Sequence, residues 1–470
     1  IRDLPESAAS IPSSIRKQPW ARVGVNVDKD FEPVYVYTTR GHSQIKKLKP
    51  LVKKAEAIFL ATDEDREGEA IAWHLLEVLK KEIKEIPVYR LVFHEITKTA
   101  IEHALKTPRT VNLDLVQAQE TRRIVDRLFG YSVSPVLWKK IRPRLSAGRV
   151  QSVAVRLVVE RERARMRFVS ATWYDLRAQF GTDKGPYDGR LVNLDGRRLA
   201  AGRDFSPDTG ALTTESTKEQ PLVLDEASAS ALELRLAGGR ATVKTVTTKS
   251  FTERPAAPFI TSTLQQEANR KLRWSARRTM NTAQRLYEAG WITYMRTDST
   301  QIAASALETL RAEIERCWGA DLLPAEPRIY KTSSKGAQEA HEAIRPAGER
   351  MRSMAECRAE FGADEAALYE LIRNRSLACQ MKDALGVRVT ADTLIETEGK
   401  GEQAIFRSGG KTYTFQGFRE VYVEGRDTVP GNGNGNGAES EAGSDRKIVL
   451  PPLTEGAAVE KLGLSSDRHD

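Results

Sequence analysis

The sequence is 470 residues long, with 29% charged and 40% hydrophobic residues and a formal net charge of +9 at pH 7. This length exceeds one ordinary hydrophobic core, so we expect two to four domains. No apolar run approaches the roughly 18 residues of a membrane-spanning helix, and the first residues lack a signal-peptide pattern, so we expect neither feature here. Three cysteines without Cys-x-x-Cys spacing argue against a disulfide framework and a zinc ribbon.

Positive charge is concentrated in one stretch of the chain. Thirteen lysines and arginines lie between Thr121 and Phe168, opposed only by Asp126, Glu160 and Glu162. This stretch therefore carries an excess of positive charge about as large as that of the whole chain. Such a concentration suits a path lined by phosphates, although a solvated basic face would have the same composition.

The first predicted elements form one half of an α/β unit. Residues Glu56–Asp63 are a short apolar run that ends in an acid, as a buried strand would. From about Gly68 the apolar residues recur with a helical period, and a second apolar strand follows at Val88–Phe93. The order strand, acidic loop, helix, strand is typical of α/β domains.

Further along, predominantly helical and β segments alternate. Residues 111–168 are typical of helices, with breaks predicted at Ser134-Pro135 and Arg142-Pro143. Short alternating β stretches follow from Trp173 to about Val246.

Helices return at about 261–385 and the β pattern at about 387–424, so a helical insertion is expected to interrupt the β-rich part. The segment 431–446 is too rich in Gly, Asn and polar residues to pack, and we expect it to be disordered.

An acidic cluster follows the first strand. Asp63, Asp65 and Glu67 project together if the backbone is extended, and Gly68 permits a sharp turn into the helix. Carboxylates grouped at a strand end suit Mg²⁺, which takes one or two carboxylates together with water and phosphate oxygens. A solvated acidic loop is the alternative interpretation.

A tyrosine and an arginine lie two residues apart after a predicted helix. Ser275 is the expected N-cap of this helix and Gly290 its stop, which places Tyr294 and Arg296 in a short extended piece. A phenol has a pKa of about 10, so it needs a neighbouring cation or base to act as a nucleophile. Arg296 could stabilise a phenolate and hold a phosphate, although a lone Tyr-x-Arg is usually a packing feature.

A histidine in the string from Gln338 to Pro346 completes the candidate residues. His341 lies among acids and is followed by Arg345, so it could donate to a phosphate oxygen. An isolated histidine in such a position is more often part of a helix surface.

Together, these strings resemble the type IA DNA topoisomerases of bacteria. The resemblance is carried by the segments 63–74 (Asp-x-Asp-x-Glu-Gly-Glu-Ala-Ile-Ala-Trp-His), 145–162 (Leu-Ser-Ala-Gly-Arg-Val-Gln-Ser and on), 294–299 (Tyr-Met-Arg-Thr-Asp-Ser) and 341–346 (His-Glu-Ala-Ile-Arg-Pro), in this order. It implies a multidomain toroid in which an α/β Toprim domain, a helical domain, a β-rich arch and a winged-helix-like domain surround a central hole. The domains that it implies are Toprim at 1–110, helical at 111–168, arch at 169–253 and 386–455, winged-helix-like at 254–385, and the return to the helical domain at 456–470.

The resemblance also implies roles for single residues. Tyr294 would form a 5′-phosphotyrosyl bond, Arg296 would position the scissile phosphate and His341 would contact phosphate. Asp63, Asp65 and Glu67 would hold Mg²⁺. The strand-binding groove and its hinge would be formed by Arg122, Arg123, Asp126, Arg149, Gln151 and Gly148.

The implied function is ATP-independent relaxation of negatively supercoiled DNA through transient cleavage of a single strand, by a monomer acting in the cytoplasm on the nucleoid. ATP independence also agrees with the sequence, because Gly410-Lys411-Thr412 lacks the first glycine of a phosphate loop at Ile405 and predicts a β-hairpin instead. Bases would stack on aromatic residues such as Trp138 or Tyr131.

The family's first Toprim strand, which carries a Lys and a catalytic Glu, would precede Ile1, and the last helices of the helical domain would follow Asp470. A catalytically impaired fragment that binds single-stranded DNA is therefore one alternative function. A Toprim-type nuclease, which would use the acids at 63–67 through Mg²⁺ alone, is another.

Overall fold

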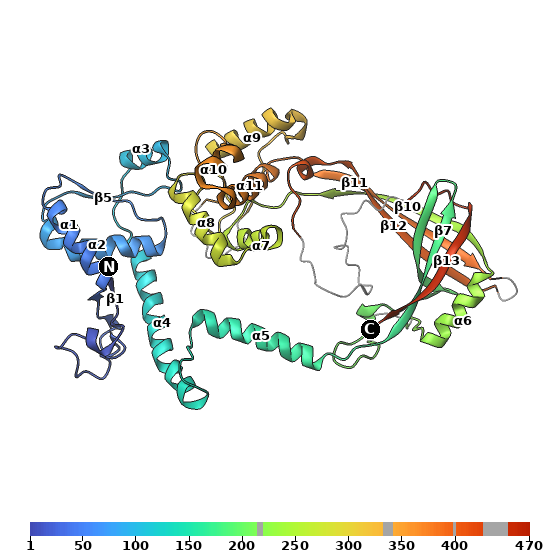
Figure 1. The fold of residues 1–470 in the computed structure, drawn as a ribbon, viewed down its shortest axis with the longest axis horizontal. Coiled ribbons are helices and arrows are strands. Elements are labelled where there is room, and N and C mark those ends of the chain that lie inside the picture. The colour runs from blue at the N-terminus through green and yellow to red at the C-terminus, as the bar shows by residue number, and fades with distance from the viewer. Residues whose placement is uncertain (214–219, 332–341, 398–400, 426–449) are drawn as a thin grey trace. The chain divides into compact units, whose positions relative to one another are not determined.

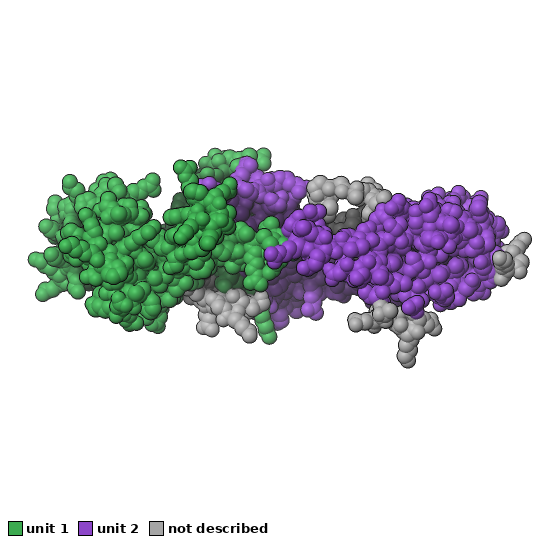
Figure 2. Space-filling view, turned by 90° about the horizontal axis from the view of Figure 1, so that it is seen from below, with its two compact units in different colours: residues 1–161, 280–301, 331–369 green, residues 162–279, 302–330, 370–470 purple. Residues whose placement is uncertain are grey.

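The computed structural model describes residues 1–213, 220–331, 342–397, 401–425 and 450–470. His341 and the segment 431–446, for which predictions are made above, lie outside these residues. The chain divides into two compact units, which are distinguished by colour in Figure 2. Unit 1 comprises residues 1–161, 280–301 and 331–369, and unit 2 comprises residues 162–279, 302–330 and 370–470.

The units cut across the domain expected at 254–385. The segments 280–301 and 331–369 belong to unit 1, whereas the rest of that range belongs to unit 2. The reason is packing: the segment around Tyr294 hydrogen-bonds to the end of the predicted Toprim domain, as described below. Among the described residues of this range are the helices labelled in Figure 1 as α7 (Thr261–Leu272), α8 (Ala276–Glu288), α9 (Ala304–Trp318), α10 (Met354–Phe361) and α11 (Ala363–Ala378).

Unit 1 contains the predicted α/β element. β5 (Ile58–Leu60) pairs in parallel with β6 (Val88–Arg90), and α2 (Arg66–Ile83) connects them. α1 (Thr39–Val52) packs on α2 through a small apolar cluster that includes Ile45 and Leu79. The other short elements are β1 (Arg2–Asp3), η1 (Ala8–Ser10), β2 (Val25–Asn26), β3 (Glu32–Pro33), β4 (Val36–Tyr37) and α3 (Lys98–Lys106).

The helix α2 begins earlier than the sequence predicted. Its N-cap is Asp65, whose carboxylate accepts a hydrogen bond from the backbone N–H of Gly68 at 2.7 Å. Gly68 therefore lies within the first turn and does not form the turn into the helix. A Cβ atom there would lie 2.0 Å from the carbonyl oxygen of Asp63, so this close approach of two backbone segments is what requires glycine.

The long helix α4 (Leu113–Lys140) corrects one of the two predicted breaks. It continues through Pro135, where the preceding residue, Ser134, accepts a hydrogen bond from the N–H of Ala147 at 3.0 Å. A proline removes one helical hydrogen bond, and the remaining bonds of this long helix keep it continuous. The other break is confirmed, because α4 ends before Arg142-Pro143. The next helix, α5 (Arg149–Arg167), has no buried residue.

Unit 2 is built on a seven-stranded antiparallel sheet in the order β12-β11-β10-β13-β7-β8-β9. β12 also pairs with β8, so the sheet closes on itself. The expected β-hairpin at 410–412 is confirmed as part of the antiparallel pair β11–β12. The strands are β7 (Trp173–Thr182), β8 (Gly185–Leu194), β9 (Arg197–Arg198), β10 (Arg240–Glu253), β11 (Ala384–Glu396), β12 (Gln403–Phe415) and β13 (Ala458–His469).

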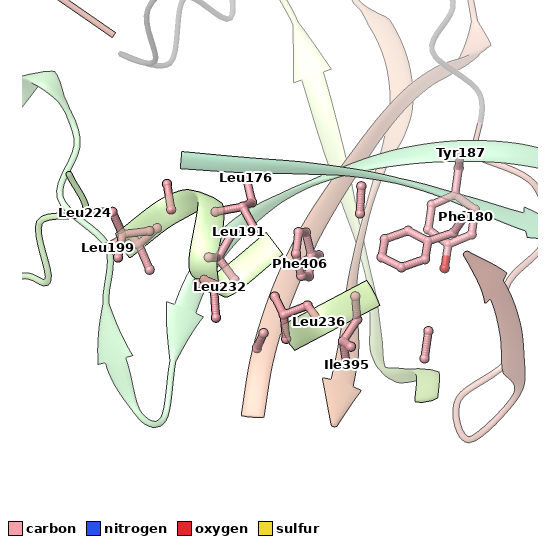
Figure 3. Close-up of a cluster of buried hydrophobic side chains, with 14 residues drawn as sticks. Leu176, Phe180, Tyr187, Leu191, Leu199, Leu224, Leu232, Leu236, Ile395 and Phe406 are labelled. Atoms are coloured by element: carbon pink, nitrogen blue, oxygen red, sulfur yellow. The ribbon is translucent and has the colours of Figure 1, made fainter. Parts of the chain in front are cut away.

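A hydrophobic core lies inside this closed sheet. Leu176 and Phe180 of β7 point inward, as the alternation of the sequence predicts, and meet Phe406 of β12 (Figure 3). The helix α6 (Glu226–Ala237), which the sequence analysis missed, adds Leu232 and Leu236 to the same core. Three short 3-10 turns complete the unit: η2 (Gly202–Asp204), η3 (Ala320–Leu322) and η4 (Gly417–Glu420).

The segment 456–470 was expected to begin the return to the helical domain. It instead contains β13, which pairs with β7 along most of its length and with β10 near its start. The physical reason is burial, because Val459 and Leu464 pack against the core of the sheet. No helix among the described residues is both long and apolar enough to cross a membrane.

Candidate functional site

The loop after β5, which carries the acidic motif, is held by a buried arginine. Arg90 ends β6, is 1% exposed and donates a hydrogen bond to Glu69 at 2.6 Å. Its guanidinium also donates, at 2.7–3.0 Å, to the backbone carbonyls of Leu60, Thr62 and Asp63. Burial favours the neutral form of Glu69, but hydrogen bonds from Arg90 and Arg109 outweigh it and hold the pKa of Glu69 below its ordinary value. Arg90 thus joins the loop to both β5 and α2.

Tyr294 lies directly against the acidic motif. Its side chain is 5% exposed, and its hydroxyl donates a hydrogen bond of 2.7 Å to Oδ2 of Asp65. The other oxygen of Asp65 caps α2, so one carboxylate both starts the helix and holds the phenol. The backbone N–H of Tyr294 donates to the carbonyl of His94 at 2.9 Å, and its ring packs edge-on against Tyr287 at 5.2 Å.

The helix before Tyr294 agrees with the sequence prediction, whereas the expected extended piece is not a strand and bends at Met295 and Arg296. Ser275 Oγ accepts from the N–H of Arg278 at 3.3 Å at the start of α8, and Gly290 follows the helix with a φ of +70°. A Cβ atom at Gly290 would lie 2.3 Å from the carbonyl oxygen of Ile96, so glycine is required here both by conformation and by space.

The segment of the tyrosine is joined to the segment of the histidine motif. Thr293 Oγ1 donates to the carbonyl of Ala343 at 2.7 Å and accepts from the N–H of Arg345 at 3.0 Å. The guanidinium of Arg345 is buried, binds Glu342 through two hydrogen bonds of 2.6 and 2.8 Å, and lies 3.0 Å from Glu95. Arg345 therefore links the histidine motif to Glu95 through buried ion pairs. His341 itself lies outside the described residues.

The charges around Tyr294 favour the neutral phenol. Burial, the hydrogen bond to Asp65 and the negative charges of Asp65 and Asp63 raise the pKa of Tyr294 above its ordinary value, and the charge of Arg296 opposes them. Burial and Asp65 also raise the pKa of Asp63, again against Arg296. Arg296 is exposed and, together with the buried Arg90, offsets the charge of the acids at this site.

The three predicted metal ligands are not gathered into one cluster. Within the described part of the chain, no three His, Cys, Asp or Glu side chains are arranged to hold a metal ion. Asp63 and Asp65 lie close enough to interact electrostatically, whereas Glu67 accepts a hydrogen bond from Gln119 at 3.2 Å. One or two neighbouring carboxylates suit Mg²⁺, so Asp63 and Asp65 are the residues that would hold it.

Four of the predicted groove residues line two neighbouring cavities in unit 1. The first has a volume of about 400 Å³ and is lined by Glu67 of the acidic motif together with Arg122, Arg123, Asp126 and Arg149. The second, of about 860 Å³, shares Arg123 and Asp126 with the first and is also lined by Tyr131 and Trp138. The tertiary structure thus joins the acidic motif to the groove residues.

Several of these groove residues are already paired. Arg123 binds Asp3 at 2.5 and 2.8 Å, and Arg149 binds Asp126 at 3.1 and 3.3 Å. Gln151 lines neither of the two cavities and lies 3.4 Å from Ser146. Gly148 precedes α5, and its N–H donates to Ser152 at 3.2 Å.

Sequence reasoning missed the residues that support the site. The predictions gave no role to the pair of Arg90 and Glu69. They also gave none to Glu64 and His94, whose side chains approach each other to 2.6 Å. A signal for Arg90 existed, because a cation inside an otherwise apolar strand must find a buried partner.

Comparison with known proteins identifies the family. The model of a family described as DNA topoisomerase matches residues 110–467, and that of the Toprim domain matches residues 22–96. DNA topoisomerase 1 of Mycolicibacterium smegmatis is 48% identical over 476 aligned residues, which cover 100% of this chain and 49% of the relative. The protein of the same name from Streptomyces coelicolor is 51% identical, with 100% of this chain and 48% of the relative covered. The chain thus spans about half the length of the curated relatives that it matches.

A solved structure supports the same assignment. Full-length topoisomerase I from Thermotoga maritima matches with a TM-score of 0.72 and 31% identity, covering 100% of this chain and 67% of the other. This match confirms the predicted fold class, which combines α/β, helical and β-rich parts. From these similarities and the two matched domains, the chain belongs to the DNA topoisomerase family, in its bacterial type IA branch.

Proposed function

We propose that this chain carries the DNA-cleaving centre of a type IA topoisomerase, in which Tyr294 attacks a phosphodiester bond of a single strand. The observation that carries this proposal is the hydrogen bond of 2.7 Å between the hydroxyl of Tyr294 and Asp65. It joins two segments that are 229 residues apart in sequence and places the phenol beside the acidic motif.

The reaction is a transesterification. The phenol oxygen of Tyr294 forms a bond to phosphorus while the bond from phosphorus to the 3′-oxygen breaks, which leaves the 5′-phosphate on the tyrosine. The hydrogen bond directs the phenolic proton toward Asp65, and the departing 3′-oxygen takes up a proton. Arg296 offers the planar pair of donors that suits a phosphate. Because the phosphotyrosyl bond conserves the energy of the broken linkage, the strand is resealed by the reverse reaction without a nucleotide.

Asp63 and Asp65 would hold a Mg²⁺ ion, with Glu67 as a third ligand if its bond to Gln119 opens. When bound, the ion would supply positive charge next to the phosphate. Burial and the neighbouring charge of Asp65 raise the pKa of Asp63, and a bound cation would relieve the repulsion between the two carboxylates. His341 is proposed as a further phosphate contact.

The groove for the single strand would follow the two cavities in unit 1. Arg123 and Arg149 would exchange their present carboxylate partners for phosphates, which would free Asp126 to accept a hydrogen bond from a cytosine edge. Arg122, which lines the first cavity, would bind phosphate beside them. Gln151 would lie along the same path, Tyr131 or Trp138 would stack on bases, and Gly148 would act as the hinge that lets α5 move.

Relaxation of negatively supercoiled DNA by a monomer acting on nucleoid DNA is the activity proposed for the whole protein. It requires the cut strand to open, a second strand to pass and the cut to be resealed.

One experiment tests the chemistry. We would incubate the chain with single-stranded DNA labelled at its 3′ end and Mg²⁺, stop the reaction with denaturant and look for labelled protein. The expected result is a covalent adduct that is absent in Tyr294→Phe and retained in Tyr287→Phe, which removes the neighbouring hydroxyl. Cleaved DNA without an adduct would instead identify a nuclease, and binding without cleavage a fragment that only binds DNA. An adduct in Tyr294→Phe would refute the assignment of the nucleophile.

A further inference from the structure

The sheet of unit 2 brings three cations into one row. Lys249 of β10 lies directly opposite Arg388 of β11, and Arg388 lies directly opposite Lys411 of β12. Residues directly opposite each other in antiparallel strands point to the same face of the sheet. Lys249 and Arg388 are exposed, and the side chain of Lys411 is 42% exposed, so the row faces solvent. The three strands are labelled in Figure 1.

The row places like charges opposite each other. Like charges directly opposite each other destabilise a sheet, and this row contains two such pairs. The carboxylate nearest Lys411 is Glu253, at 3.5 Å, and Glu253 also binds Arg419 at 2.9 Å. One negative charge is therefore shared by two cations. An anionic ligand with repeated charges would relieve the repulsion along the row.

The neighbouring row holds one of these cations in place. Phe251, Gly386 and Tyr413 are cross-strand neighbours, and a Cβ atom at Gly386 would lie 2.4 Å from the ring of Phe251, so the glycine leaves space for that ring. The ammonium of Lys411 lies 4.6 and 4.8 Å from the ring centres of Phe251 and Tyr413. Contacts of this kind attract cations, so Lys411 is ordered before any ligand arrives.

We infer that the row of Lys249, Arg388 and Lys411 binds the phosphodiester backbone of single-stranded DNA, as a contact surface additional to the groove in unit 1. Neighbouring strands lie about 4.8 Å apart, so the row spans about 10 Å, a length over which a flexible strand can present several phosphates. An exposed sheet face with cations beside aromatic rings is a common binding surface for single strands. The inference rests on the proposed function only in requiring that the chain binds single-stranded DNA.

The test compares two triple variants of the full chain. The first replaces Lys249, Arg388 and Lys411 with glutamine. The second, a matched control, makes the same change in charge at three other exposed cations of unit 2: Lys184, Arg197 and Arg240. Binding of a thymidine homopolymer long enough to reach both units is measured at several salt concentrations, together with thermal unfolding as a check on folding.

Each phosphate contact on a single strand contributes about 0.7 to the slope of log affinity against log salt, so the first variant should lower the slope by about 2. Between 50 and 200 mM salt, the native chain should then lose about 20-fold more affinity than the variant. Adduct formation at Tyr294 on a short oligonucleotide should be unchanged in both variants. The control should keep the native slope.

Three results would overturn the inference: an unchanged slope in the first variant, an equal decrease in the control, or an equal loss of binding to a duplex of the same length. A second readout is local. The homopolymer should protect Lys249 and Lys411, but not Lys184, from chemical acetylation, and a lack of protection would also overturn the inference. Absence of an adduct in the native chain would refute the proposed chemistry and leave this surface unaffected.

Discussion

The buried pair of Arg90 and Glu69 offers a way to separate the stability of unit 1 from the geometry of its site. In Arg90→Met, Glu69 keeps its bond to Arg109, whose side chain is 37% exposed, but loses its fully buried partner. Removing one member of a buried ion pair typically costs about 3–5 kcal/mol. The carbonyls of Leu60, Thr62 and Asp63 lose their donor as well. We therefore expect a loss of unfolding free energy near the upper end of that range.

The double variant Arg90→Met/Glu69→Leu separates the two effects. Replacing a buried ion pair with apolar side chains is often neutral or stabilising, so most of the lost stability should return. In both variants the carbonyl of Asp63 lacks its donor, so the acidic loop is held less firmly. We therefore expect adduct formation to be impaired in the single variant and in the double variant. Recovery of stability without recovery of activity is the expected signature.

The assay is urea unfolding followed by hydrogen exchange at β5 and β6, which isolates unit 1 from the rest of the chain. Arg350→Met removes an exposed pair with Glu356 and serves as a control that should leave stability unchanged. The reasoning would be refuted if Arg90→Met cost less than about 1 kcal/mol, or if the double variant were no more stable than the single one.

Three further predictions concern other parts of the chain. Gly68→Ala should abolish adduct formation, because its Cβ would lie 2.0 Å from the carbonyl oxygen of Asp63. The control Gly409→Ala has no atom within 4 Å of its Cβ and should form the adduct normally in the same labelling assay. Phe406→Ala should destabilise unit 2 by about 3–5 kcal/mol in urea unfolding, because the ring is fully buried in the core of the sheet. Below pH 6.5, unfolding free energy should fall, because burial and Arg2 lower the pKa of His74 to about 4 and the unfolded chain then binds more protons than the folded one. Between pH 6.5 and 4 the expected loss of unfolding free energy is about 1–2 kcal/mol, a value lowered because solvent partly screens the His74 side chain. This loss should be absent in His74→Gln.

Each of these predictions has a result that would contradict it. A normal adduct yield in Gly68→Ala would show that the loop can move away from the helix. A cost in Phe406→Ala no larger than in Phe59→Ala, where the ring is 47% exposed, would argue against a continuous core. If stability in His74→Gln declined with falling pH as in the native chain, another group would be responsible for the titration.

Local patterns in the sequence were sufficient for several parts of this molecule. The strand before Asp63, the helix that stops before Gly290 and the alternation in β7 each depend on neighbouring residues, and each is present. The strand before Asp63 is less buried than predicted, because Phe59 in its middle is 47% exposed. The two errors in helices have a local origin as well. Pro135 was expected to break a helix, but the long helix α4 continues through it. Gly68 was expected to form the turn into α2, but glycine is required there because the backbone of Asp63 comes close.

Burial and distant pairing were not accessible in this way. Whether the segment 456–470 becomes a strand depends on β7 and β10, which precede it by more than 200 residues. Arg90 and Glu69 could be recognised as a pair only after α2 and β6 were packed together. Interactions of this kind depend on the free energy of burying charge, which is a property of the assembled interior.

The sequence alone therefore determined the family resemblance, the candidate nucleophile Tyr294 and the acidic motif, because short strings of residues carry this information. Only the tertiary structure decided that Asp65 is the acid that contacts Tyr294, that Glu67 turns toward Gln119 and that Arg90 supports the loop. The physical reason is that a hydrogen bond depends on distance and direction in space, and separation along the chain specifies neither.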